Sequence, residues 1–89
     1  MKRNPDFLLR EVAGRQVIVP VGMAVTIFPG MITVNETGAF LWEQLAEEHT
    51  LDALVQAVTG VYEVEQTVAE RDVQAFVEKL RSTGALIEE

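Results

Sequence analysis

The sequence predicts a small α+β domain in which short strands precede three helices. Between residues 7 and 34, β-branched and other apolar residues form short runs separated by glycines and prolines, as is typical of strands and turns. Between residues 35 and 83, apolar residues recur three and four positions apart, which indicates amphipathic helices. The chain has 89 residues, and we expect residues 1–89 to form a single domain.

The first part of the chain is expected to contain four extended segments, at residues 7–12, 16–20, 23–28 and 31–34. Ala13 and Gly14 separate the first two segments and predict the turn of a hairpin. Prolines cannot donate a hydrogen bond to a strand ladder, and Pro20 and Pro29 end the second and third segments. The sequence therefore predicts a small sheet with exposed edges.

The first two helices are predicted from their caps and their apolar stripes. Asn35 and Thr50 can each accept a hydrogen bond from an unpaired amide at a helix start, so we expect them to be N-caps. The stripe of the first helix consists of Gly38, Leu41, Trp42 and Leu45. The stripe of the second helix consists of Leu51, Leu54, Val55 and Val58. Gly60 is expected to end the second helix.

The third helix is predicted from a capping box. Thr67 and Glu70 have the spacing at which each side chain bonds the other residue's main-chain amide, which places the helix start at Thr67. The stripe of this helix consists of Ala69, Val73, Phe76, Val77 and Leu80. Gly84 is expected to end the helix. Leu86 and Ile87 are then expected to fold back onto the core.

The composition excludes several classes of function. The chain has no cysteine and a single histidine, His49, which excludes disulfides, thiolate sites and multi-histidine metal sites. Seven Lys and Arg face fourteen Asp and Glu, and this net charge of -7 argues against a nucleic-acid-binding surface. We expect no catalytic residue, no metal and no cofactor. No apolar run approaches the ~20 residues of a membrane span, and no signal peptide is indicated, so a cytoplasmic protein is expected.

An exposed sheet edge beside an amphipathic helix makes peptide binding a candidate function. The unpaired amides and carbonyls of an edge strand can be satisfied by a peptide that adds as a further strand. Apolar side chains of a neighbouring helix would then provide pockets for peptide side chains. The predicted sheet and the predicted third helix supply both features.

The segment Gly30–Leu45, GMITVNETGAFLWEQL, resembles the PqqD-like family. These are the small partner proteins of pyrroloquinoline quinone biosynthesis and the related peptide-recognition elements of ribosomally made, modified peptides. The family pattern is a strand ending in Leu-Asn-Glu-Thr, then a helix with a large apolar residue and a leucine. Val34 replaces the usual leucine here. Downstream, the pattern is also matched by residues 50–55, Tyr62, Asp72, Val73, Phe76 and Leu80.

The resemblance implies a winged-helix-like fold, with a three-stranded antiparallel sheet followed by three helices. It implies that the chain binds the leader segment of a precursor peptide as an added strand and presents it to a modifying enzyme, often a radical S-adenosylmethionine enzyme. The leader would lie against the third strand and the third helix. The peptide-binding residues expected from this placement are Met31, Ile32, Thr33, Val73, Gln74, Val77 and Arg81.

Either flank of the third helix can face the expected groove. One flank carries Val77 with Gln74 and Arg81, and we favour it because an apolar residue beside the stripe widens the stripe toward the groove. The other flank carries Val68, Asp72 and Lys79. Two alternative functions share the predicted architecture. One is a winged-helix DNA-binding regulator, and the other is a structural module that forms a homodimer through its free strand edge.

Overall fold

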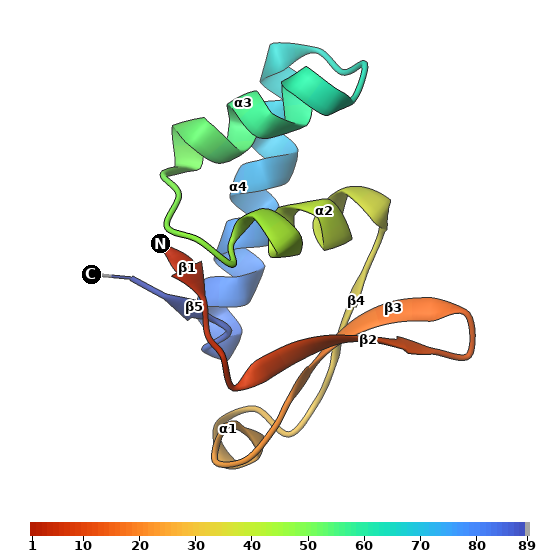
Figure 1. The fold of residues 1–89 in the computed structure, drawn as a ribbon, viewed down its shortest axis with the longest axis vertical. Coiled ribbons are helices and arrows are strands. Elements are labelled where there is room, and N and C mark those ends of the chain that lie inside the picture. The colour runs from red at the N-terminus through yellow and green to blue at the C-terminus, as the bar shows by residue number, and fades with distance from the viewer. Residues whose placement is uncertain (89) are drawn as a thin grey trace.

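The computed structural model describes residues 1–88 and confirms a three-stranded antiparallel sheet followed by three helices (Figure 1). The strands of this sheet lie in the order β2 (Phe7–Val12), β3 (Arg15–Pro20) and β4 (Ile32–Val34). The helices are α2 (Glu36–Gln44), α3 (Leu51–Val61) and α4 (Gln66–Thr83). No helix within residues 1–88 has the length and apolarity needed to cross a membrane.

The predicted hairpin is confirmed as the β2–β3 pair. Its ladder pairs Phe7 with Pro20 at one end and Val12 with Arg15 at the other. The connecting residues Ala13 and Gly14 have φ angles of 52° and 80°, which are the positive values that a two-residue turn needs to match the strand twist. The turn therefore fixes the register of the sheet, and β4 joins the other side of β3.

The prediction of a strand at residues 23–28 is wrong, because residues Ala24–Ile27 form a short helix, α1. Gly22 has a φ of 60° and turns the chain out of the sheet, and its carbonyl accepts from the amide of Val25 at 3.2 Å. The hydroxyl of Thr26 donates to the carbonyl of Met23 at 2.7 Å. These local hydrogen bonds outweigh the β-propensity of the segment, and β4 is left as the last strand of the sheet.

The first two helices begin where the sequence predicts. The side chain of Asn35 accepts from the amide of Gly38 at 2.8 Å, and that of Thr50 accepts from the amide of Ala53 at 3.1 Å. The prediction for the end of the second helix is wrong, because α3 continues through Gly60 to Val61.

The start of the third helix differs from the prediction. α4 begins at Gln66, and its N-cap Glu65 makes no side-chain capping bond. Thr67 lies inside the first turn, so it forms no capping box with Glu70; the amide group of Gln66 instead donates to the carboxylate of Glu70 at 3.2 Å. The predicted end is confirmed, because Gly84 has a φ of 86° as a left-handed C-cap.

The two ends of the described chain lie side by side. β1 (Lys2–Arg3) pairs with β5 (Leu86–Ile87) as a separate two-stranded piece (Figure 1). The amide of Asn4 also donates to the carbonyl of Ala85 at 2.9 Å. Leu86 packs against the hydrophobic core, which confirms the expected return for this residue, whereas Ile87 is not among the residues packed against the core.

The hydrophobic core lies between the sheet and the three helices. It includes Ile18 and Ile32 from the sheet and Leu54 and Leu80 from the helices. Trp42 is its largest member and is 1% exposed, which confirms the prediction that it is a core residue. Burial of these apolar side chains is the main force that holds the helices on the sheet.

Candidate functional site

The outer edge of β4 is open. β4 pairs with β3 through Gln16↔Val34, Val17↔Thr33 and Ile18↔Ile32, and no other strand within residues 1–88 pairs with it. The two-residue turn makes Val12 and Arg15 a hydrogen-bonded pair. Hydrogen-bonded pairs alternate with non-bonded pairs along an antiparallel ladder, so Arg10 and Val17 are the next bonded pair. Val17 therefore directs its N–H and C=O to β2. The N–H and C=O of Thr33, which lies opposite Val17 on β4, therefore point to the outer edge.

A cavity of about 310 Å³ lies along this open edge, and we call it the β4 groove. Its walls are β4, the start of α2 and one face of α4. The side chains that α4 contributes are Asp72, Ala75, Phe76 and Lys79. A peptide strand beside Thr33 would therefore have a helical wall next to it.

Gly38 allows the walls of the β4 groove to approach one another. A Cβ atom on this residue would lie 3.1 Å from the Cβ of Val34 and 3.3 Å from the ring of Phe76. Near the other end of α4, a Cβ on Gly84 would lie 3.7 Å from Ile27, which precedes β4 in the chain. Thus α4 runs antiparallel to β4, with Asp72 toward the carboxyl end of the strand and Lys79 toward its amino end.

The structure places the expected residues of the third strand in or near this groove. Thr33 is exposed and lines it. Ile32 also lines it, but its side chain is buried in the core with 2% exposure. Met31 precedes the strand and is 56% exposed, and it is not part of the groove lining.

The preference for the Val77 flank of the third helix is wrong. Val73 and Val77 are 0% and 2% exposed, so both side chains belong to the core. Gln74 and Arg81 are exposed, and neither lines the β4 groove. The groove takes the other flank because the buried stripe of α4 already uses Val73 and Val77, which leaves the neighbouring row of side chains to face β4. The spacing of Asp72, Ala75, Phe76 and Lys79, at intervals of three and four, was the sequence signal for that row.

Charges differ between the two flanks of α4. Arg81 pairs with Glu78 and, at 2.6 Å, with Glu88. The hydrogen bond to Glu88 is the main cause that raises the pKa of Arg81. Beside the groove, Asp72 has a loose contact with Arg71, at 3.7 Å between exposed groups. Within residues 1–88 no group of three or more side chains could hold a metal ion.

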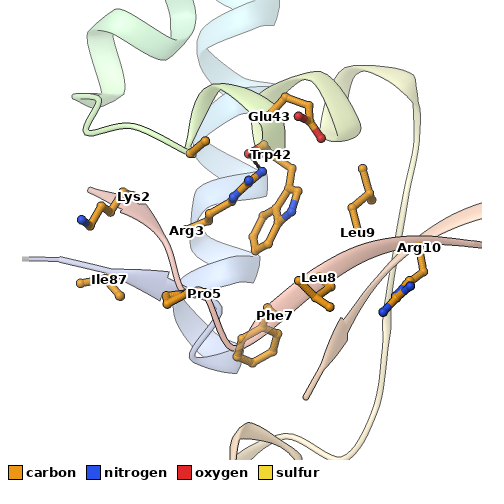
Figure 2. A pocket seen from close by; sticks show the side chains of 11 residues that line it. Lys2, Arg3, Pro5, Phe7, Leu8, Leu9, Arg10, Trp42, Glu43 and Ile87 are labelled. Carbon is orange, nitrogen blue, oxygen red and sulfur yellow. Dashed lines mark hydrogen bonds between the residues drawn. The ribbon is translucent and has the colours of Figure 1, made fainter. Parts of the chain in front are cut away.

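The opposite edge of the sheet carries a second and larger cavity of about 710 Å³, which we call the β2 groove. It lies between β2, β1 and the end of α2 (Figure 2). The guanidinium of Arg3 lies over the ring of Trp42, 5.6 Å from its centroid, and donates to the carbonyl of Trp42 at 3.1 Å. The sheet is therefore flanked by a groove at each of its two edge strands.

These features define a small α+β protein with an open edge strand next to a helix. The sequence matches the model of the family described as coenzyme PQQ synthesis protein D (PqqD) over residues 10–86, and the chain belongs to the PqqD family. This confirms the resemblance found in the sequence. No curated protein matches the sequence significantly.

Two solved structures share the fold over almost their whole length. TbiB1, in complex with the TbiA(beta) leader peptide, is 19% identical with a TM-score of 0.75, and the match covers 100% of this chain and 98% of that one. A lasso peptide synthetase B1, complexed with the leader peptide, is 26% identical with a TM-score of 0.72, and the match covers 98% and 96% of the two chains.

Proposed function

We propose that this protein binds the leader segment of a ribosomally made precursor peptide in the β4 groove and presents it to a modifying enzyme. The observation that carries the proposal is the outward-facing main chain of Thr33 in a groove with α4 as its wall. Membership of the PqqD family and the two leader-bound structures of the same fold support it.

Binding would begin with main-chain pairing. The N–H and C=O of Thr33 pair with one residue of the leader, as when a peptide extends a sheet by one strand. β4 has three residues, so it spans about 10 Å at 3.3 Å per residue. Asp72 and Lys79 are seven positions apart on α4, which is also about 10 Å at 1.5 Å per residue. The groove therefore fits a short extended segment of the leader.

Side chains of the groove would select among leaders. Ala75 and Phe76 form an apolar wall between Asp72 and Lys79. A leader with an apolar side chain facing α4, a basic residue near Asp72 and an acidic residue near Lys79 matches this wall in shape and charge. The exposed charges would contribute mainly to selectivity and to the rate of association, because surface ion pairs add little affinity.

The chain itself makes and breaks no bond in this proposal. It supplies hydrogen bonds and apolar contacts, and the modifying enzyme, which we propose to be a radical S-adenosylmethionine enzyme, supplies the reaction. A cytoplasmic location, where the precursor is translated, belongs to the same proposal. Without a peptide, the open edge of β4 would pair two copies of the chain, so added leader should shift such a dimer to monomer.

Replacing Thr33 by proline tests the proposal directly. Proline removes the N–H that points to the groove, and an edge strand tolerates it because no bond to β3 is lost. We expect a synthetic leader, taken from a short reading frame found beside the gene, to bind about two- to tenfold more weakly, from the loss of a hydrogen bond of about 0.5–1.5 kcal/mol. Thr33→Val keeps the N–H and the branched shape and is the matched control.

Calorimetric titration would measure both affinities, and circular dichroism would establish that both variants are folded. Equal leader affinity of Thr33→Pro and Thr33→Val would show that β4 does not pair with the leader. Retardation of DNA in a gel at low salt would instead favour the DNA-binding alternative.

A further inference from the structure

The β2 groove concentrates positive charge on an acidic protein. Lys2, Arg3 and Arg10 line it, which are three of the seven Lys and Arg in a chain of net charge -7. Among the described residues that line it, Glu43 is the only one with a carboxylate. Within residues 1–88 none of the three cations forms an ion pair with a carboxylate. The exposed charges of Lys2 and Arg10 are therefore available to an outside partner, whereas the guanidinium of Arg3 already contacts Trp42.

The groove also presents an open strand edge. β2 pairs only with β3 within the described residues. Successive residues of β3 direct their N–H and C=O to opposite sides, so Ile18 directs these groups to β4 and Val17 directs them to β2. Leu9 lies opposite Ile18 on β2. The N–H and C=O of Leu9 therefore point away from β3, to the outer edge that the groove follows. An extended chain can pair with this edge as well.

Apolar surface lies between the charges. Figure 2 shows Lys2 and Arg10 at opposite ends of the groove, with Leu8 and Phe7 between them. The side chain of Leu8 remains 37% exposed, although it lines the groove. A matching ligand would carry an apolar side chain with acidic residues on both sides. The volume of about 710 Å³ is within the usual range of specific binding sites.

We propose that the β2 groove docks an extended acidic segment of the modifying enzyme. This inference rests on the proposed function, because presentation of a leader requires a second surface for the enzyme. The two grooves lie at opposite edges of one sheet, so leader and enzyme segment bind at the same time. Opposite charge would also steer the two proteins together, an effect that salt weakens.

The test uses two synthetic peptides labelled with fluorescein, GSELELEGS and GSKLKLKGS, with fluorescence anisotropy as the readout. We expect the protein to bind the glutamate peptide at least tenfold more tightly than the lysine peptide. We expect this affinity to fall about fivefold or more between 50 and 500 mM NaCl, because screening weakens exposed charge pairs. No binding of the glutamate peptide at 1 mM protein, or equal binding of the two peptides, would overturn the proposal.

Charge reversal then locates the site. We expect Arg10→Glu to weaken binding of the glutamate peptide about fivefold or more, because it places a repulsive charge in the groove. Arg15→Glu makes the same change at an exposed residue at the start of β3 that does not line the groove, and the affinity of this variant should stay within twofold of the wild type. Equal losses in the two variants would overturn the assignment to the β2 groove.

Two further measurements separate this inference from its rivals. Thr33→Pro changes only the β4 groove, so it should bind the glutamate peptide with wild-type affinity. Loss of leader binding at the β4 groove can therefore be told apart from loss of peptide binding at the β2 groove. A ten-residue oligo-thymidylate should not compete with the peptide. Competition at equal concentration would overturn the peptide assignment in favour of a nucleic-acid ligand.

Discussion

Replacing Gly38 by alanine is expected to destabilise the protein, although glycine usually weakens a helix. The added Cβ would lie 3.1 Å from the Cβ of Val34 and 3.3 Å from both the Oδ1 of Asn35 and the ring of Phe76. The Cβ of Val34 is bonded to the main chain and cannot rotate away. We expect overpacking to cost about 1.5–2 kcal/mol. Alanine returns about 0.5–1 kcal/mol through helix propensity, which leaves a net loss of about 1 kcal/mol.

Gly60 provides a matched control for this substitution. It also lies in a helix, α3, and a Cβ there would meet nothing within 4 Å. Gly60→Ala should therefore stabilise the protein by about 0.5–1 kcal/mol. The two variants should differ by about 1.5–2 kcal/mol, which corresponds to a difference of about 6–16 °C in Tm for a domain of this size.

Urea unfolding and thermal melts followed by circular dichroism would measure both variants. Gly38→Ala should also bind the leader more weakly, because Phe76 must move within the β4 groove to make room. If Gly38→Ala were as stable as Gly60→Ala, the close approach of β4, α2 and α4 at this position would be refuted.

Three further substitutions test the caps and the core. Asn35→Ala should lower the free energy of unfolding by about 1 kcal/mol through loss of the N-cap of α2, and urea midpoints unchanged from the wild type would contradict that cap. Phe76→Ala should cost about 2 kcal/mol, below the 3–5 kcal/mol of a fully buried phenylalanine, because the ring is partly exposed; it should also weaken leader binding in calorimetry. Val77→Asp should prevent folding, because Val77 is 2% exposed and a carboxylate there has no partner; a wild-type circular dichroism spectrum with weaker leader binding would restore Val77 to the groove.

Elements that depend on neighbouring residues could be predicted from the sequence. The Ala13-Gly14 turn, the Asn35 and Thr50 caps and the end of α4 at Gly84 were predicted correctly, because each uses hydrogen bonds or φ angles within a few residues. The helix α1 was missed because the turn at Gly22 competes with β-propensity, and propensity alone does not weigh the two.

The site required knowledge of contacts distant in the sequence. Thr33 lines the β4 groove, where chain order places an edge strand beside its neighbours, and its role in peptide binding stays a prediction. The flank of α4 was predicted wrongly because an apolar residue next to a stripe can widen the buried face as well as a groove. Burial of Val77 decides between the two, and it depends on where the other elements pack. The β1–β5 pair was not predicted, since segments of two residues carry no periodic signal.

The pairing of β1 with β5 has a practical consequence for labelling. Both ends of the described chain leave the protein at one place, and none of the residues of β1 or β5 lines the β4 groove (Figure 1). Lys2 and Ile87, by contrast, line the β2 groove. A fluorescent protein or purification handle fused to either end would thus lie near the β2 groove and leave the edge of β4 accessible. Handles rich in aspartate or glutamate would be poor choices, because they would compete with an acidic ligand for the β2 groove.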